Sequence, residues 1–194
     1  NFHANSFDRF PNKTGKVYIG VDLAQTGDYT VAVCMDSSGS VIEIYRDNNK
    51  EWETMQTRII QLAQKYNATV MLETNSMGSV ILEAVKKKWQ DTHGFNTSNQ
   101  SKRDIVESLI LGFNEGTVRI PSATLYPELH RELEVFEMTY NPQTRSVKYA
   151  ARPPLHDDIV IALCISNWCR LQNKNYGAYA IQGGTILPSG FKYM

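Results

Sequence analysis

The sequence predicts a single α/β domain in which helices cover both faces of a mixed sheet. Three short runs rich in β-branched and aromatic residues follow one another near the start, and helical and strand patterns alternate after them. Of the 194 residues, 42% are hydrophobic and 21% are charged, as in a globular domain with one continuous core. This length leaves no room for a two-domain motor or a membrane transporter.

Charge and cysteine content narrow the possible partners and compartments. The net charge is zero, because 20 Lys and Arg balance 20 Asp and Glu, so a nucleic-acid partner would need a local basic patch or bound metal. The three cysteines form no C-x-x-C pair, which argues against a disulfide framework and favours a reducing compartment. No apolar run reaches the roughly 18 residues that span a bilayer and no signal peptide opens the chain, so we expect a soluble, unsecreted protein with no membrane partner.

The first half of the chain predicts a meander followed by a helix and a strand. Residues 1–15 are polar and rich in turn formers, and we expect a lead-in or linker there. Three strands joined by short turns are predicted as an antiparallel meander: 16–22, 29–36 and 40–46. Apolar residues at helical spacing then predict a helix over 51–66, and residues 68–73 predict a short apolar strand.

The second half alternates between helices and strands. Three further helices are predicted: 78–89, 101–113 and about 125–137. A brief strand is expected at 94–97, and a hairpin between residues 138 and 149. A nearly all-apolar helix is predicted over 156–171, followed by a tail over 172–194. The element order is that of a ribonuclease H-like domain over residues 16–171, with an added β-hairpin.

Acidic residues stand at the ends of apolar elements. Asp22 and Glu73 each end an apolar strand, and Asp157 and Asp158 open the apolar helix. Ionised carboxylates beside a core are costly without a cation, and no Lys or Arg adjoins them in sequence. Two divalent ions, Mg²⁺ or Mn²⁺, would resolve the repulsion, activate a water and stabilise a leaving oxygen. The alternatives are a turn former at Asp22 and a helix cap at the aspartate pair.

Four sequence motifs carry a resemblance to a known family. They are IGVDLA (19–24) with GDYT (27–30), MLETN (71–75), GTVRIP (116–121) and HDDIVIAL (156–163). Over residues 16–171 the chain resembles the nuclease domain of the large terminase subunit of tailed phages. The resemblance implies a ribonuclease H-like fold related to Holliday-junction resolvases, and metal-dependent cutting of double-stranded DNA during genome packaging in the host cytoplasm. It also implies a packaging ATPase domain before Asn1, with the portal and the small terminase subunit as further partners.

The resemblance assigns roles to individual acids. Asp22 would bridge two ions, Glu73 would hold one, and Asp158 would hold the other. Asp157 would bind through water or serve the second ion, because neighbouring helix residues point about 100° apart. At position 161, where family members often carry another acid, this chain has isoleucine, which leaves one ion with fewer ligands.

Other polar residues are candidates for outer-shell or DNA contacts. Asp28 and His156 are possible outer-shell groups around the ions, and packing or capping is the alternative for His156. Basic residues at a helix start and on or after the hairpin are candidates for phosphate contacts: Lys102, Arg103, Arg145, Lys148 and Arg152. A solubilising role is their alternative.

Two other functions compete with the terminase nuclease. One is a junction resolvase or transposase-like nuclease of the same fold. The other is a catalytically silent DNA-binding or docking module, which the zero net charge and Ile161 leave open.

Overall fold

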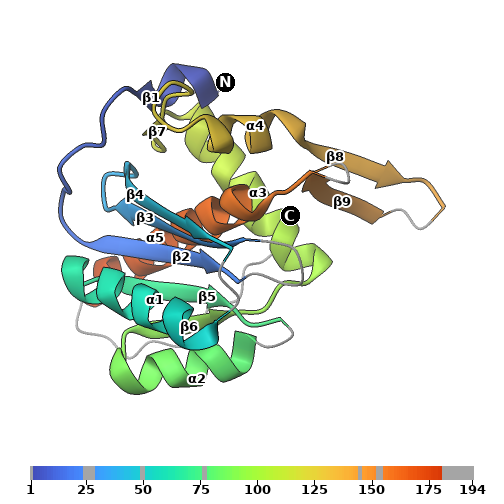
Figure 1. Cartoon of the computed structure of the whole chain (residues 1–194). Helices are drawn as coiled ribbons and strands as arrows, with labels where there is room; N and C mark the ends of the chain where they lie inside the picture. Colours follow the sequence, from blue (N-terminus) through green and yellow to red (C-terminus); the bar gives the residue numbers. More distant parts are fainter. Residues whose placement is uncertain are drawn as a thin grey trace.

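A five-stranded mixed sheet with the order β4-β3-β2-β5-β6 forms the centre of the molecule (Figure 1). The computed structural model describes residues 2–23, 29–48, 51–75, 78–143, 146–151 and 155–180. The first three strands form the predicted antiparallel meander: β2 (Val17–Asp22), β3 (Thr30–Asp36) and β4 (Val41–Asp47). Strand β5 (Thr69–Glu73) runs parallel to β2, and β6 (Thr92–Phe95) runs parallel to β5.

Helices cover both faces of this sheet, as predicted. Helices α1 (Trp52–Tyr66) and α2 (Gly78–Lys88) pack on one face, where Ile59 and Ile81 join the side chains of β2 and β5. The other face is covered by three helices: α3 (Asn99–Asn114), α4 (Pro127–Val135) and α5 (Asp158–Ala180). Each face therefore has its own hydrophobic core, and the sheet lies between the two.

The contact between β2 and α5 fixes the relative position of two acids. Alternate residues of β2 face opposite sides, so Tyr18, Gly20 and Asp22 face α5. Ser166 donates a hydrogen bond from its hydroxyl to the Tyr18 carbonyl (3.0 Å), and Gly20 lies against the backbone of Ala162 and Ser166. Two strand residues and four helix residues each advance about 6 Å. Strand and helix run in opposite directions, so the end of β2 and the start of α5 meet.

Several element boundaries differ from those predicted. The strand expected at 94–97 is β6, two residues earlier, because Thr92 pairs with Val70 of β5. The helix expected over 125–137 is α4, which begins at Pro127 and stops before Phe136, the first residue of a strand. Helix α5 continues past residue 171 to Ala180, so the tail expected from 172 begins inside a helix. The polar run 172–175 interrupts the apolar pattern there, which is why the sequence predicted an earlier end.

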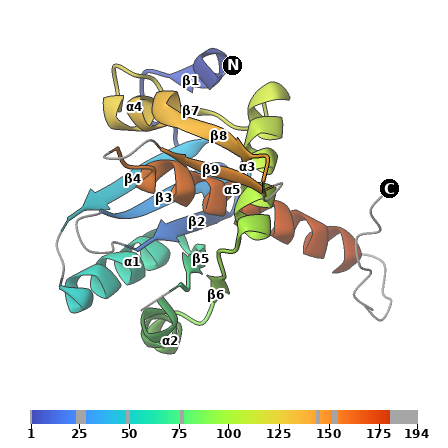
Figure 2. The same cartoon turned by 90° about the vertical axis from the view of Figure 1, so that its right-hand side faces the viewer.

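The predicted hairpin consists of β8 (Phe136–Asn141) and β9 (Ser146–Ala151). It extends away from the sheet in Figure 1 and lies beside α3 and α5 in Figure 2. The expected lead-in also carries structure, since η1 (Phe2–Asn5) precedes β1 (Ser6–Phe7), which pairs in parallel with β7 (Ile120–Pro121). In the described part of the chain, no helix combines the length and apolarity needed to cross a membrane.

Candidate active site

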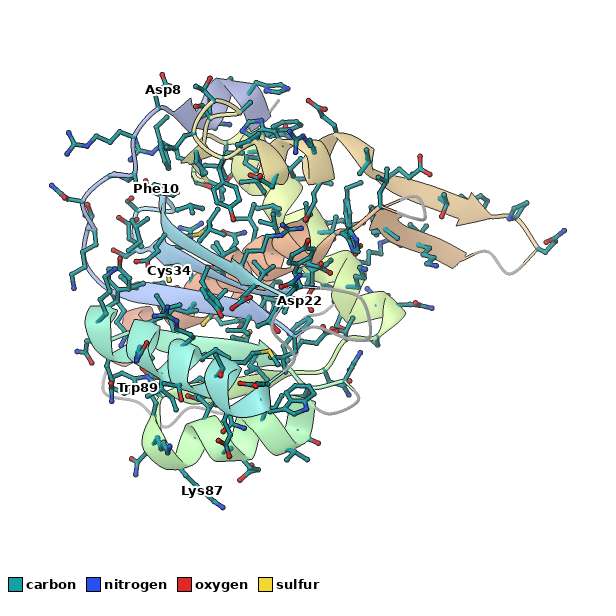
Figure 3. All side chains as sticks on the ribbon, in the orientation of Figure 1. Asp8, Phe10, Asp22, Cys34, Lys87 and Trp89 are labelled. Atoms are coloured by element: carbon teal, nitrogen blue, oxygen red, sulfur yellow. The ribbon has the colours of Figure 1, made fainter. Side chains whose placement is uncertain are left out.

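Asp22 and Glu73 lie side by side at one edge of the sheet. Each is the last residue of its strand, and the parallel pairing of Val21 with Leu72 brings the two acids level with each other. Their carboxyl groups interact through a hydrogen bond. Figure 3 shows Asp22 at the end of β2, on the side from which the β8–β9 hairpin extends. Two strand ends that are far apart in the chain thus place two carboxyl groups together.

The surroundings of Asp22 disfavour its charged form. The residue is only 9% exposed, and burial raises the pKa of Asp22 well above the usual range of an aspartate. The hydrogen bond and charge of Glu73 raise that pKa further, as do the charges of Asp158 and Asp157. Without a cation, Asp22 holds its proton more tightly than an exposed aspartate does, because a buried carboxyl group beside other acids is costly to ionise.

Asp158 and Asp157 open α5 close to this pair but have different partners. Asp158 is 8% exposed, and its Oδ2 accepts a hydrogen bond from the backbone N–H of Tyr29 (3.2 Å). The Nδ1 of His156 lies 3.8 Å from the same oxygen, and the His156 ring packs edge-on against Tyr29. Asp157 forms an ion pair with Lys102 (3.3 Å). The two aspartates therefore face different neighbours, as their helical spacing predicts.

The carboxylate oxygens of the four acids are suitable ligands for a divalent cation, although the four side chains do not surround a common position. Among the residues that the structure describes, no three His, Cys, Asp or Glu side chains are placed so that they could hold a metal ion. Asp22 and Glu73 contact each other, whereas Tyr29 and Lys102 engage the aspartates of α5. Buried Asp22 and half-buried Glu73 nevertheless supply hard oxygen donors, and the charges of two more acids act on Asp22. Mg²⁺ and Mn²⁺ prefer such oxygen ligands.

Of the predicted DNA-contacting residues, one is close to the acids. Lys102, near the start of α3, points to Asp157, while Arg103 pairs with Glu107 on its own helix (2.7 Å). Lys148 is exposed on β9. The remaining DNA-contact candidates, Arg145 and Arg152, lie outside the described residues, and so does Asp28, the possible outer-shell acid.

Two residues at the site carry signals that the sequence analysis did not use. Glu132 of α4 is buried, and its Oε2 accepts hydrogen bonds from the backbone N–H groups at the start of α5. Burial raises the pKa of Glu132 to about 7 despite these bonds. The sequence does contain a signal for Glu132: it lies three residues after Leu129 and next to Leu133, so it is an acid on the apolar face of a helix. Arg46 of β4 stacks on the Tyr29 ring, with Cζ 3.4 Å from the ring centroid.

Ile161 is the residue for which the resemblance implied a missing acidic ligand. It is 4% exposed and packs in the core between the sheet and α5. This position therefore contributes packing and no oxygen ligand.

Comparisons with known proteins give one consistent answer. Residues 19–165 match the family model of the terminase RNaseH-like domain. The large terminase nuclease from thermophilic phage G20c with bound magnesium superposes with a TM-score of 0.73 at 21% identity, covering 84% of this chain and 92% of that one. The nuclease domain from Thermus phage P74-26 gives a TM-score of 0.64 at 24% identity, with 78% and 77% covered.

A more distant solved structure has the same fold. The nuclease domain of the large terminase subunit of bacterial virus Sf6, a K428A mutant with manganese and beta-thujaplicinol, gives a TM-score of 0.60 at 10% identity, with 82% and 89% covered. No curated protein matches the chain in sequence. The mixed sheet and its flanking helices therefore form the predicted ribonuclease H-like fold, and the chain belongs to the terminase RNaseH-like domain family.

Proposed function

We propose that this chain is a divalent-metal-dependent endonuclease that cuts double-stranded DNA during the packaging of a viral genome. The observation that carries the proposal is the contact between buried Asp22 and half-buried Glu73 at the edge of the sheet, beside the acidic start of α5. Family membership supports the assignment, as do related nucleases solved with bound magnesium, cobalt, zinc or manganese.

In this proposal, Asp22, Glu73 and Asp158 hold the ions, and Asp157 assists from the same helix turn. Two ions of Mg²⁺ or Mn²⁺ would lower the pKa of a bound water and stabilise charge on the phosphate oxygens. The residues of the chain place the oxygen donors: β2 and β5 hold Asp22 and Glu73 level, and the Tyr29 N–H orients Asp158. Lys102 contributes a positive charge that attracts a DNA phosphate towards the acids.

The test is cleavage of supercoiled and linear plasmid with Mg²⁺ or Mn²⁺ by three separate variants: Asp22→Asn, Glu73→Gln and Asp158→Asn. Each variant is expected to lose roughly two orders of magnitude in rate, because an amide replaces an anionic ligand. Asp8→Asn is the matched control, since Asp8 is exposed and lies far from Asp22 in Figure 3. Wild-type rates in all three site variants would refute the proposed function, and a marked preference for four-way junctions would favour a resolvase.

The proposed partners follow from the same assignment. We expect double-stranded DNA as the substrate and a packaging ATPase domain before Asn1 in the full-length chain. The portal and the small terminase subunit are further proposed partners, in the host cytoplasm. Cleavage assays with and without the packaging ATPase domain test whether the motor regulates the nuclease.

A further inference from the structure

Glu132 connects α4 to the first turn of α5. Its Oε2 accepts hydrogen bonds from the backbone N–H of Ile159 (2.7 Å) and from that of Val160 (3.2 Å). Glu132 is 6% exposed, and its Oε1 has no hydrogen-bond partner within the described part of the chain. An acid from another helix thus serves the start of the helix that carries the acids of the site.

This contact replaces a cap that the helix would otherwise need from its own residues. The first N–H groups of an α-helix have no partner within the helix, and an aspartate just before or at its start usually accepts from them. Asp157 and Asp158 are the residues in that position. Because Glu132 already accepts from Ile159 and Val160, the carboxylates of the two aspartates contact Lys102 and Tyr29 instead.

We infer that Glu132 is a positioning residue: by capping α5 from outside, it keeps the carboxylates of Asp157 and Asp158 available to a divalent cation. The inference rests on the proposed function, because it needs a cation at the Asp22–Glu73 pair. Without the Glu132 contact, one of the aspartates would turn back to cap its own helix and leave the site.

Four side chains at position 132 distinguish the effect of side-chain length from the effect of charge. Glu132→Gln keeps the length and an acceptor oxygen but removes the charge, and Glu132→Asp keeps the charge but is one methylene shorter. Glu132→Asn is both shorter and neutral. If capping is the role of Glu132, the two short variants share one behaviour, and Gln resembles the wild-type Glu.

The experiment is titration calorimetry with Mn²⁺ alone, together with amide hydrogen exchange at Ile159 and Val160. We expect both short variants to bind Mn²⁺ at least about tenfold more weakly than wild type, because losing a contact that supports metal ligands typically has an effect of this size. The amides of Ile159 and Val160 should also exchange faster in these variants. Glu132→Gln is expected to stay within about threefold of wild type, since it retains the acceptor. Glu134→Gln and Glu134→Asp are matched controls, because Glu134 is exposed on the same helix.

The outcomes separate this inference from the proposed function. Short variants that bind Mn²⁺ as wild type does would overturn the inference, and so would a Glu132→Gln variant that binds as weakly as they do. If one short variant fails to fold, the other and Glu132→Gln still decide. A wild-type chain that binds no Mn²⁺ contradicts the proposed function itself.

Discussion

Gly20 of β2 lies directly against the backbone of Ser166 of α5: a Cβ atom added to Gly20 would come within 2.2 Å of the Ser166 nitrogen and of the Ala162 carbonyl oxygen. No side chain separates strand from helix here, and the Ser166 hydroxyl bonds the Tyr18 carbonyl. This close approach sets how far α5 stands from the sheet. It therefore also sets the separation between Asp22, two residues after Gly20 on the strand, and Asp158, eight residues before Ser166 on the helix.

Replacing Gly20 by alanine is expected to be strongly destabilising. The new methyl group meets backbone atoms that belong to a long helix, so it displaces α5 as a whole. We expect a loss of about 3 kcal/mol or more in the free energy of unfolding, measured by urea denaturation. Gly94→Ala is the control, because its Cβ would meet the side-chain ends of Thr74 and Leu82, which can move, and its loss should be smaller. Equal losses in the two variants would contradict this explanation.

The acids at the strand ends could be predicted because they depend on local patterns. An apolar strand that ends in Asp22 or Glu73 is visible in the sequence, and parallel strands expose their carboxyl ends at one edge. The order of elements and the aspartate pair before an apolar helix were equally visible. These observations predicted the fold and the edge of the sheet at which the proposed site lies.

The contacts around the acids could not be predicted because they join residues far apart in the chain. Glu132 lies 27 residues before Ile159, and Lys102 lies 55 residues before Asp157. Each contact depends on how α4 or α3 packs against α5, which periodicity does not specify. The end of α5 could not be predicted either, because the polar run 172–175 interrupts the apolar pattern before the helix ends.

Asp22 is expected to make the metal-free protein less stable as the pH rises. Its pKa is raised in the folded state by burial, by Glu73 and by the charges of Asp158 and Asp157, so the folded protein binds the proton more tightly than the unfolded chain. The contribution of Asp22 to stability is then greatest below the usual aspartate pKa, and it falls as the pH rises through the interval up to the raised value. In EDTA at neutral pH, Asp22→Asn should be more stable than wild type by about 1–2 kcal/mol.

Thermal unfolding across pH in EDTA measures this effect. The advantage of Asp22→Asn should shrink as the pH is lowered, because wild-type Asp22 then takes up its proton. Mn²⁺ should raise the melting temperature of wild type much more than that of the variant, since only wild type retains the ligand. Asp8→Asn should follow wild type throughout. An Asp22→Asn variant less stable than wild type at neutral pH in EDTA would contradict the raised pKa of the buried Asp22 carboxyl group.

The three cysteines are expected to be unreactive in the folded protein. All are free and buried, and burial raises the pKa of Cys169 to about 12 and also raises those of Cys34 and Cys164. Thiolates form rarely under these conditions, and a reagent cannot reach them. A chromogenic disulfide reagent should detect no thiol at neutral pH and three after denaturation in guanidinium. Rapid labelling of any thiol in the folded state would show that one of the two cores is open.

Lys102 forms an ion pair with Asp157 and is also the proposed contact for a DNA phosphate near the acids. Its ion pair with Asp157 is partly shielded, since both side chains are 25% exposed. Removing the positive charge in Lys102→Gln makes the site more negative, so the affinity for Mn²⁺ should rise about threefold or more. The affinity for DNA should fall, and the slope of log affinity against log salt should decrease by about one.

Lys87→Gln separates this local effect from a general change in charge. Lys87 is exposed on α2 and points away from the body of the molecule in Figure 3. It should leave the Mn²⁺ affinity unchanged, because its charge is screened over that distance. Opposite shifts in metal and DNA affinity for Lys102→Gln alone would place its ammonium group between the acids and the DNA. If both affinities fell together, Lys102 would instead support the structure of the site by holding Asp157 in place.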